Sequence, residues 1–279
     1  AWTALLSVAV LTTKQHLVGD VLAGYLFGVF AAAVTLALQR AAVELRTIGA
    51  VLLEYGVIIA TLSIALSWRN PWILASAFVI IATRQHALFV LYHDATHRLW
   101  CRHGRINDVL VNFFVGLPQL LPIEVYRPLH LDHHRHLGTP QDPESRYLFH
   151  AQVWRYRPLP LPLLGMQLAG DLLLLNNLRS ARAYLAERGA AALAPSLALV
   201  IAALPWLGIG LWLLLNLDAG TLVVLALLWF GPLLTVTNLL QKLRSYAEHS
   251  GGPEVSPDWP AWTYSWRAGW LGRATVWPY

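Results

Sequence analysis

The stretch PWILASAFVIIATRQHALFVLYHDATH, from Pro71 to His97, contains the two features that decide the fold of this chain. The part up to Tyr92 is mostly apolar and long enough to cross a bilayer, since a spanning helix needs about 20 residues. The end, HDATH, places His93 and His97 four positions apart, which puts both side chains on one helix face. The stretch therefore predicts a membrane helix that carries a histidine pair out of the bilayer.

The composition indicates a membrane protein. Of 279 residues, 57% are hydrophobic and 13% are charged, which is about half the charged share of a soluble domain. We therefore expect an all-α integral membrane protein, in which pairs of transmembrane helices and interfacial helices carry a cytoplasmic histidine-rich site. The net charge of +5 is typical of basic loops beside membrane helices, and we expect no nucleic-acid partner. The single cysteine, Cys101, excludes an intrachain disulfide and a thiolate metal cluster.

Five apolar stretches have the length of a membrane span. Short, turn-rich connections at 69–71 and 216–220 predict that two consecutive pairs run antiparallel. Two further apolar runs, 109–123 and 159–175, are short and interrupted by prolines, so we expect interfacial or re-entrant helices there. The five stretches are Leu17–Gln39, Ile48–Ser67, Pro71–Tyr92, Ala191–Leu215 and Thr221–Leu240.

The basic residues indicate how these stretches are oriented. Arg40 and Arg46 lie in the loop between the first two stretches, and loops rich in arginine and lysine stay cytoplasmic. If the two short runs do not cross the bilayer, both histidine clusters and His249 emerge on the same side as this loop. We therefore expect a multi-pass protein, of a bacterial inner membrane, with a cytoplasmic histidine site.

A second cluster, HLDHHRH at 130–136, adds further histidines to the first pair. Imidazole is the commonest side-chain metal ligand, and spacings of three and four from His130 aim His133 and His134 at a shared region. Adjacent histidines can also serve two neighbouring metals. We expect Asp94 and Asp132 to accept hydrogen bonds from the imidazole N–H groups, which would orient the rings.

Two other metal functions fit these histidines less well. A zinc hydrolase needs a glutamate general base directly after the first histidine, where Asp94 stands. A metal transporter needs ligands in the middle of its spans, whereas these histidines lie at span ends. We expect the remaining histidines outside the metal site: His86 packed deeper in its helix, His136 beside the ligands or at the surface, and His103 and His150 in loops.

The motifs resemble the membrane fatty acid desaturases and their related hydroxylases and ketolases, whose three histidine boxes read H-x-x-x-H, H-x-x-H-H and H-x-x-H-H. The first two boxes match residues 93–97 and 130–134. The run HHRHLGTPQDP at 133–143 is similar to the extended second box, and RSYAEH at 244–249 is similar to the R-x-x-x-E-H element after the last membrane helix. The resemblance covers residues 45–279 and predicts a desaturase-like domain there.

The resemblance implies a non-haem diiron oxygenase that uses dioxygen and two electrons to introduce a double bond into a fatty acyl chain of a lipid or thioester. It implies an electron donor such as a ferredoxin or a cytochrome b-type carrier. A carotenoid or sterol hydroxylase or ketolase of the same superfamily is the alternative. Carried over by position, the two iron ions would be held by His93, His97, His130, His133, His134 and His249.

The third histidine box of that family is missing. No H-x-x-H-H follows His249 before the chain ends at Tyr279. The resemblance therefore predicts a desaturase-like domain that is truncated at its C-terminus.

The amino end resembles a different family. The sequence TTKQHLVGD at 12–20, followed by VLAG, is similar to the last motif of type 2 phosphatidic acid phosphatases, in which a nucleophilic histidine and an orienting carboxylate form an H-x-x-x-D pair. The resemblance implies His16 and Asp20 as catalytic residues and residues 1–40 as the C-terminal remnant of a phosphatase-like membrane domain. Val10 replaces the family's arginine, so a histidine and an aspartate at the start of a membrane helix are the alternative. For the whole chain, the alternative is a lipid phosphatase with an inactive desaturase-like domain.

Overall fold

The computed structural model describes residues 27–31, 44–137, 139, 141–148, 160–188, 195–249 and 269–275. These residues form helices and their connections, without a strand among them, which confirms the all-α prediction. The predicted span Leu17–Gln39 lies mostly outside the described residues. The phosphatase-like motif with His16 and Asp20 lies outside them completely, so the division into domains at 1–40 and 45–279 stays a prediction.

The first helix pair consists of α3 (Leu45–Trp68) and α4 (Pro71–Thr96). Arg69, between them, adopts a left-handed conformation with φ 45° and closes the end of α3 by a backbone hydrogen bond to Ala65. Asn70 then accepts a 2.9 Å hydrogen bond from the backbone N–H of Trp72 and so caps α4, whose first residue is a proline. The short connection therefore reverses the chain, as the sequence predicts.

The second helix pair begins with α9 (Leu197–Asn216). It continues after a tight connection with α10 (Ala219–Pro232), a π-helical turn η5 (Leu233–Thr237) and α11 (Asn238–Glu248), which together form one helical run. Asp218 starts this run by accepting a 3.0 Å hydrogen bond from the N–H of Thr221. Among the described residues, four helices are long and apolar enough to cross a membrane: α3, α4, α9 and the run from Ala219 to Glu248.

The two proline-interrupted runs form short helices instead of spans. The first contains α5 (Gly104–Val111), the π-helical turn η1 (Asn112–Gly116) and the start of α6 (Ile123–His136). The second forms α7 (Leu161–Leu172), which is followed by α8 (Leu175–Arg188). Two smaller elements complete the described chain, η2 (Glu144–Leu148) and α13 (Trp270–Thr275).

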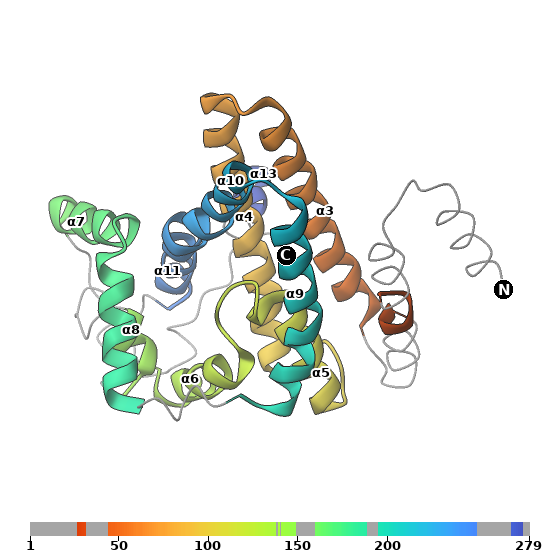
Figure 1. Cartoon of the computed structure of the whole chain (residues 1–279). Helices are drawn as coiled ribbons and strands as arrows, with labels where there is room; N and C mark the ends of the chain where they lie inside the picture. The colour runs from red at the N-terminus through yellow and green to blue at the C-terminus, as the bar shows by residue number, and fades with distance from the viewer. Residues whose placement is uncertain are drawn as a thin grey trace, which may run out of the picture.

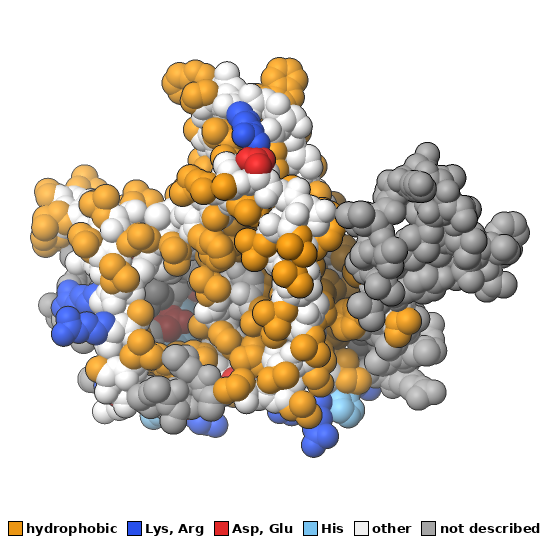
Figure 2. Space-filling model, viewed as in Figure 1, with side chains coloured by type: hydrophobic (Ala, Val, Ile, Leu, Met, Phe, Trp, Pro, Cys, Tyr) orange, Lys and Arg blue, Asp and Glu red, His pale blue; other side chains and the backbone are white. Residues whose placement is uncertain are grey.

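The helices arrange the chain into an apolar middle and a polar end. In Figure 1, α3 and α4 run alongside each other, α9 passes in front of α4, α6 lies near the lower end of α4, and α8 stands to the left of α11. Figure 2 shows apolar side chains over this middle, with lysine, arginine and histidine side chains at the lower edge. This distribution is what a helix bundle in a bilayer requires, since charged groups leave the hydrocarbon region.

The lower end of the bundle is held together by aromatic residues whose polar atoms are hydrogen-bonded. Tyr92 and Trp100 are almost completely buried. The Tyr92 hydroxyl donates to the Leu121 carbonyl at 2.6 Å, and the Trp100 indole donates to the Leu91 carbonyl at 2.8 Å. These contacts attach the chain that precedes α6 to α4, and so they place the second histidine cluster beside the first.

Candidate metal centre

The helix α4 extends past its apolar stretch and so presents the first histidine pair at the polar end of the bundle. His93 lies in the last turn of α4, and His97 caps its end. The second cluster lies on α6, with His130 and His133 buried and His134 exposed. The prediction that the two clusters meet is confirmed, because His93, His97, His130 and His134 converge in one group.

Arg127 connects the two helices that carry these histidines. Its Nε donates to the Thr96 carbonyl at 3.0 Å, and its Nη2 donates to the Ala95 carbonyl at 3.3 Å. Both carbonyls lie between His93 and His97. The other side of the guanidinium forms a bidentate pair with Asp108 at 2.6 and 2.9 Å. Because such a fork fixes direction as well as distance, Arg127 sets the position of α6 against the end of α4.

The four converging imidazoles are close enough to share one ion. The Nε2 atom of His130 lies 3.0 Å from Nε2 of His97 and 2.9 Å from Nε2 of His134. The ring centroids of His93 and His130 are 4.4 Å apart. One nitrogen from each of the four rings lies within 4.8 Å of the others. Four nitrogen donors at this separation form a candidate metal site.

The electrostatics of the group favour the neutral imidazole, which is the form that binds metal. Burial, together with the neighbouring His93, lowers the pKa of His130 to about 2. Partial desolvation also lowers the pKa of His97 and of His134, to which the nearby imidazoles of His93 and His133, respectively, contribute. Near neutral pH these rings therefore present nitrogen lone pairs instead of repelling a cation.

A second donor group lies beside the first. The rings of His133 and His249 have centroids 5.0 Å apart, although they come from α6 and from the residue after α11. His133 Nδ1 lies 2.9 Å from the carboxylate of Asp142, which is fully buried. A carboxylate at this position fixes the ring orientation and the tautomer, leaving Nε2 for a metal. The Glu144 carboxylate lies 3.8 Å from that Nε2 atom and accepts a hydrogen bond from Ser245.

The carboxylates that orient the rings are only partly those that the sequence indicated. Asp94 lies near His93, with 3.5 Å between Oδ1 and Nδ1. Asp132 contacts Arg135 at 3.1 Å instead of a histidine. The shortest contact between a carboxylate and one of these imidazoles joins Asp142 to His133. Asp142 belongs to the Asp-Pro pair that ends the extended second box, and this pair was the signal in the sequence that could have pointed to it.

The remaining histidines lie as follows. His86 is fully buried in α4, as expected, but it also lines the cavity beside the metal-ligand candidates. His103 is exposed at the start of α5, and His136 is exposed at the end of α6. His150 lies outside the described residues.

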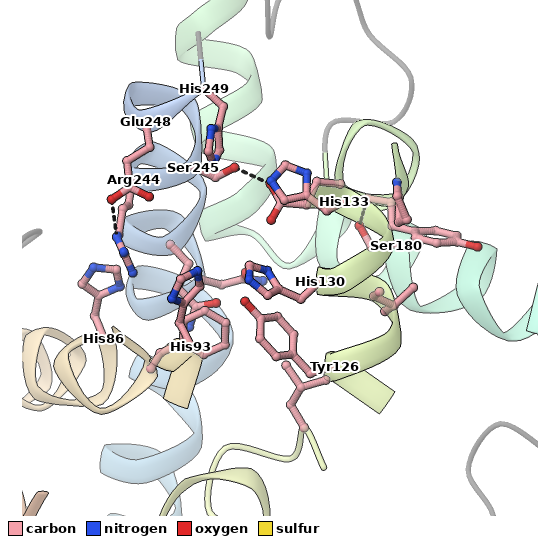
Figure 3. A pocket seen from close by; sticks show the side chains of 18 of the residues that line it. His86, His93, Tyr126, His130, His133, Ser180, Arg244, Ser245, Glu248 and His249 are labelled. Atoms are coloured by element: carbon pink, nitrogen blue, oxygen red, sulfur yellow. Dashed lines mark hydrogen bonds and ion pairs between the residues drawn. The ribbon is translucent and has the colours of Figure 1, made fainter. Parts of the chain in front are cut away.

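A cavity of about 320 Å³ adjoins both donor groups. Figure 3 shows His93 on α4, His130 and His133 on α6, and His249 after α11 around this space. Ser180 on α8 and Arg244 on α11 line the same cavity. A space this close to the histidines can admit part of a small substrate.

The donor set fits a transition metal. Neutral imidazoles with one nearby carboxylate are suitable ligands for iron, zinc, copper or nickel. The four-histidine group has its nitrogens close enough together to bind one ion, and His133 and His249 provide further nitrogen donors next to it.

A family model described as fatty acid desaturase matches residues 69–278, which is most of the chain and includes both histidine clusters. The chain belongs to the fatty acid desaturase family. This family and the histidine cluster together indicate a membrane protein with a metal cofactor.

Two curated relatives of this desaturase-family chain match over shorter stretches. A sphingolipid delta(4)-desaturase of Drosophila melanogaster is 31% identical over 75 residues, which is 26% of this chain and 23% of the relative. A dihydrorhizobitoxine desaturase of Bradyrhizobium elkanii is 32% identical over 109 residues, which is 38% of this chain and 30% of the relative. The matches thus span less than a third of either relative. No solved structure matches the chain.

Proposed function

We propose that this protein is a membrane non-haem diiron oxygenase that introduces a double bond into a fatty acyl chain of a lipid or thioester. The observation that carries the proposal is the group of His93, His97, His130 and His134, whose ring nitrogens lie within 4.8 Å of one another where the end of the membrane helix α4 meets α6. Both curated relatives are named desaturases, which supports the same reaction type.

The proposal assigns the two donor groups to two irons. The four-histidine group would hold one, and His133 and His249 would contribute to the other. When bound, the irons would supply the reduction of dioxygen to two waters, using two electrons from a donor, two protons, and two hydrogen atoms from adjacent acyl carbons. The electron donor would be a ferredoxin or a cytochrome b-type carrier, and the site would face the cytoplasm of a bacterial inner membrane.

The residues around the donors orient them and shape the substrate space. Asp142 holds the His133 ring through Nδ1, and Arg127 holds the two histidine clusters in register. The Tyr126 ring lies stacked on His130, with centroids 5.3 Å apart, and limits how that imidazole can turn. Phe89 and Leu121 line the adjoining cavity and would keep water from the reacting part of the acyl chain.

Metal analysis tests the proposal directly. The chain, purified from iron-supplemented cells, is expected to contain about two irons per molecule, and its cells to contain new unsaturated lipids by mass spectrometry. Purified protein that takes up zinc and excludes iron would contradict the proposed mechanism. The exposed His136, which lies on the same helix as the ligand candidates, provides the matched control through His136→Ala.

A further inference from the structure

The second donor group, beside the four converging histidines, contains a carboxylate as well as two imidazoles. His133 comes from α6 and His249 from the residue after α11, and their ring centroids are 5.0 Å apart. Glu144 is the first residue of η2, and its Oε2 atom lies 3.8 Å from Nε2 of His133. All three residues line the cavity. We call them the mixed group, because together they offer nitrogen and oxygen atoms to an ion.

The contacts of His133 call for a positive charge between its ring and Glu144. Nδ1 of this buried ring lies 2.9 Å from Oδ1 of Asp142, which is buried too. A carboxylate only accepts hydrogen bonds, so Nδ1 carries the proton and Nε2 of the neutral ring presents its lone pair. Nε2 therefore faces the Glu144 carboxylate as one electron-rich atom facing another. A cation between the two atoms, either a second ring proton or a metal ion, makes this arrangement favourable.

The distance between the two atoms favours the metal ion. An N–H···O hydrogen bond places nitrogen and oxygen about 2.7–3.2 Å apart, so the 3.8 Å between Nε2 of His133 and Oε2 of Glu144 is too long for a shared proton. Bonds from nitrogen or oxygen to a metal such as zinc are about 2.1 Å long, so two atoms that share an ion lie up to about 4.2 Å apart. The separation is therefore within the range for two ligands of one ion.

The carboxylate of the mixed group is held in place from two directions. The backbone N–H of Glu144 donates to Asp142 at 2.9 Å, so Asp142 positions both this residue and the His133 ring. The Glu144 carboxylate accepts a 2.5 Å hydrogen bond from the hydroxyl of Ser245 on α11. The Ser245 carbonyl in turn accepts from the His249 N–H at 3.1 Å. Figure 3 shows His133, Ser245 and His249 around the same part of the cavity, so both histidines are linked to the carboxylate.

The other carboxylates of the cavity are bonded to cations. Among the described residues, three carboxylates line this space. Asp171 bonds to Lys242 at 3.0 Å. Glu248 bonds to Arg244 at 2.7 Å. Glu144 lies against an imidazole of the mixed group, and is thus the carboxylate that is placed for an ion at these histidines.

The chemistry of the mixed group suits iron(II). Two imidazoles and one carboxylate are the ligand set that binds iron(II) in non-haem oxygenases and leaves coordination positions open. The four-histidine group, in contrast, offers nitrogen only. Two divalent ions side by side repel each other, and neutral imidazoles do not reduce their charge. One carboxylate at the second ion offsets part of this repulsion.

We propose that Glu144 is a metal ligand, and that with His133 and His249 it forms a two-histidine, one-carboxylate site for the second iron(II) ion. The inference rests on the proposed function, since that function requires two irons. It adds an oxygen ligand to the six histidines predicted from the sequence. It also makes the two ion sites chemically different, one with nitrogen ligands only and one with nitrogen and oxygen.

Titration of the metal-free chain in lipid nanodiscs with cobalt(II) tests the assignment without any turnover. We expect about two ions per chain. Glu144→Gln keeps the size of the side chain and removes the ligand, and it is expected to weaken the second ion more than 100-fold while the first binds as before. Groups that only orient a ligand change metal affinity about 10- to 100-fold. A loss of 100-fold or less would therefore overturn the assignment of Glu144 as a ligand.

A second substitution separates a ligand from a mere negative charge. Glu144→His places a nitrogen as many bonds from Cα as the carboxylate oxygens are, and it is expected to restore the second ion with a changed cobalt spectrum. If the second ion stays lost while the first still binds, charge alone explains the effect and the proposal is overturned. Glu187→Gln, at an exposed position on α8, is the control and is expected to leave both ions unchanged.

Infrared difference spectra give a readout on the unaltered chain. Addition of iron(II) under anaerobic conditions to protein labelled with ¹³C-glutamate is expected to shift a labelled carboxylate band, and the shift is expected to be absent in Glu144→Gln. An unshifted band would overturn the proposal. A failure of the proposed function looks different, because then the four-histidine group would bind no iron. A second ion that binds independently of Glu144 counts against this inference alone.

Discussion

His130 is the residue on which the candidate metal centre depends most. Its Nε2 atom lies within 3.0 Å of ring nitrogens of His97 and of His134, and its ring packs against both His93 and Tyr126. It is also the most buried of the four converging histidines. Replacing His130 therefore removes the imidazole that lies next to each of the other three histidines.

We expect His130→Ala to abolish metal binding at the four-histidine group, so that about half of the iron or less remains per molecule. Iron content and the optical spectrum of the cobalt-substituted protein measure this loss. His136→Ala, at an exposed position on the same helix, is expected to leave both unchanged. Full iron content in His130→Ala would rule out this residue as a ligand.

Arg127 is a candidate positioning residue, because it holds together the two helices that carry the candidate metal ligands. Arg127→Lys keeps the charge but loses the bidentate pair with Asp108 and the bonds to the end of α4. We expect metal affinity to fall about 10- to 100-fold, as for other groups that orient ligands. The change is measured by chelator competition.

Arg135→Lys is the control for this substitution, since Arg135 is exposed and pairs only on the surface with Asp132. A purely structural role for Arg127 would lower the melting temperature of the metal-free chain and leave metal affinity and the cobalt spectrum of the folded fraction unchanged. That result would contradict the positioning role.

At the scale of elements, α10 packs on α4 at close range, and this contact depends on a glycine. A Cβ atom at Gly231 would lie 2.7 Å from Cε2 of Phe78 on α4. Gln85 on α4 stabilises the same contact between α4 and α10. Its side chain donates a hydrogen bond to the Trp229 carbonyl at 2.8 Å and accepts one from the Thr237 hydroxyl at 2.9 Å. The approach of the second helix pair to the first is thus set by a small residue and by buried hydrogen bonds.

We expect Gly231→Ala to destabilise the chain by about 1–3 kcal/mol, because the Phe78 ring must move within a packed interface. Thermal unfolding in detergent, followed by circular dichroism, measures the change. Gly208→Ala in α9 is the control, since a Cβ there meets nothing within 4 Å. An equal effect of the two substitutions would show that helix propensity, and not packing, governs the result.

The sequence was sufficient for the spans and for the meeting of the two clusters. Apolar length predicted the helices α3, α4, α9 and α10, and the absence of a crossing between residues 109 and 123 placed both clusters at one end. It was not sufficient for Asp142 or for the contact between α8 and α11 that lines the cavity. Asn177 and Asn238 are 61 positions apart and carry no motif, so only tertiary packing brings them to one space.

At the scale of the whole molecule, the candidate metal centre links parts of the chain that are distant in sequence. α4, α6 and the end of α11 each contribute histidines, and Glu144 lies beside them in the connection after α6. An ion that binds these groups only in the folded state stabilises the entire arrangement by mass action.

We therefore expect iron(II) under anaerobic conditions to raise the melting temperature of the metal-free chain, and a chelator to reverse the rise. His130→Ala is expected to remove most of this shift, and His136→Ala to retain it. A shift of the same size in both variants would mean that the ion binds elsewhere on the molecule.

The uninterrupted helix α4 also sets how far from the bilayer centre the candidate metal centre lies. From Pro71 to His93 it rises about 33 Å at 1.5 Å per residue, close to the ~30 Å thickness of the hydrocarbon core. With Pro71 at one membrane surface, the histidines are held at the other, level with the lipid head groups. A lipid that stays upright in its leaflet presents the carbons nearest its head group at this level. The carbons near its methyl end would reach the same level only if the lipid were pulled out of the bilayer or folded back on itself.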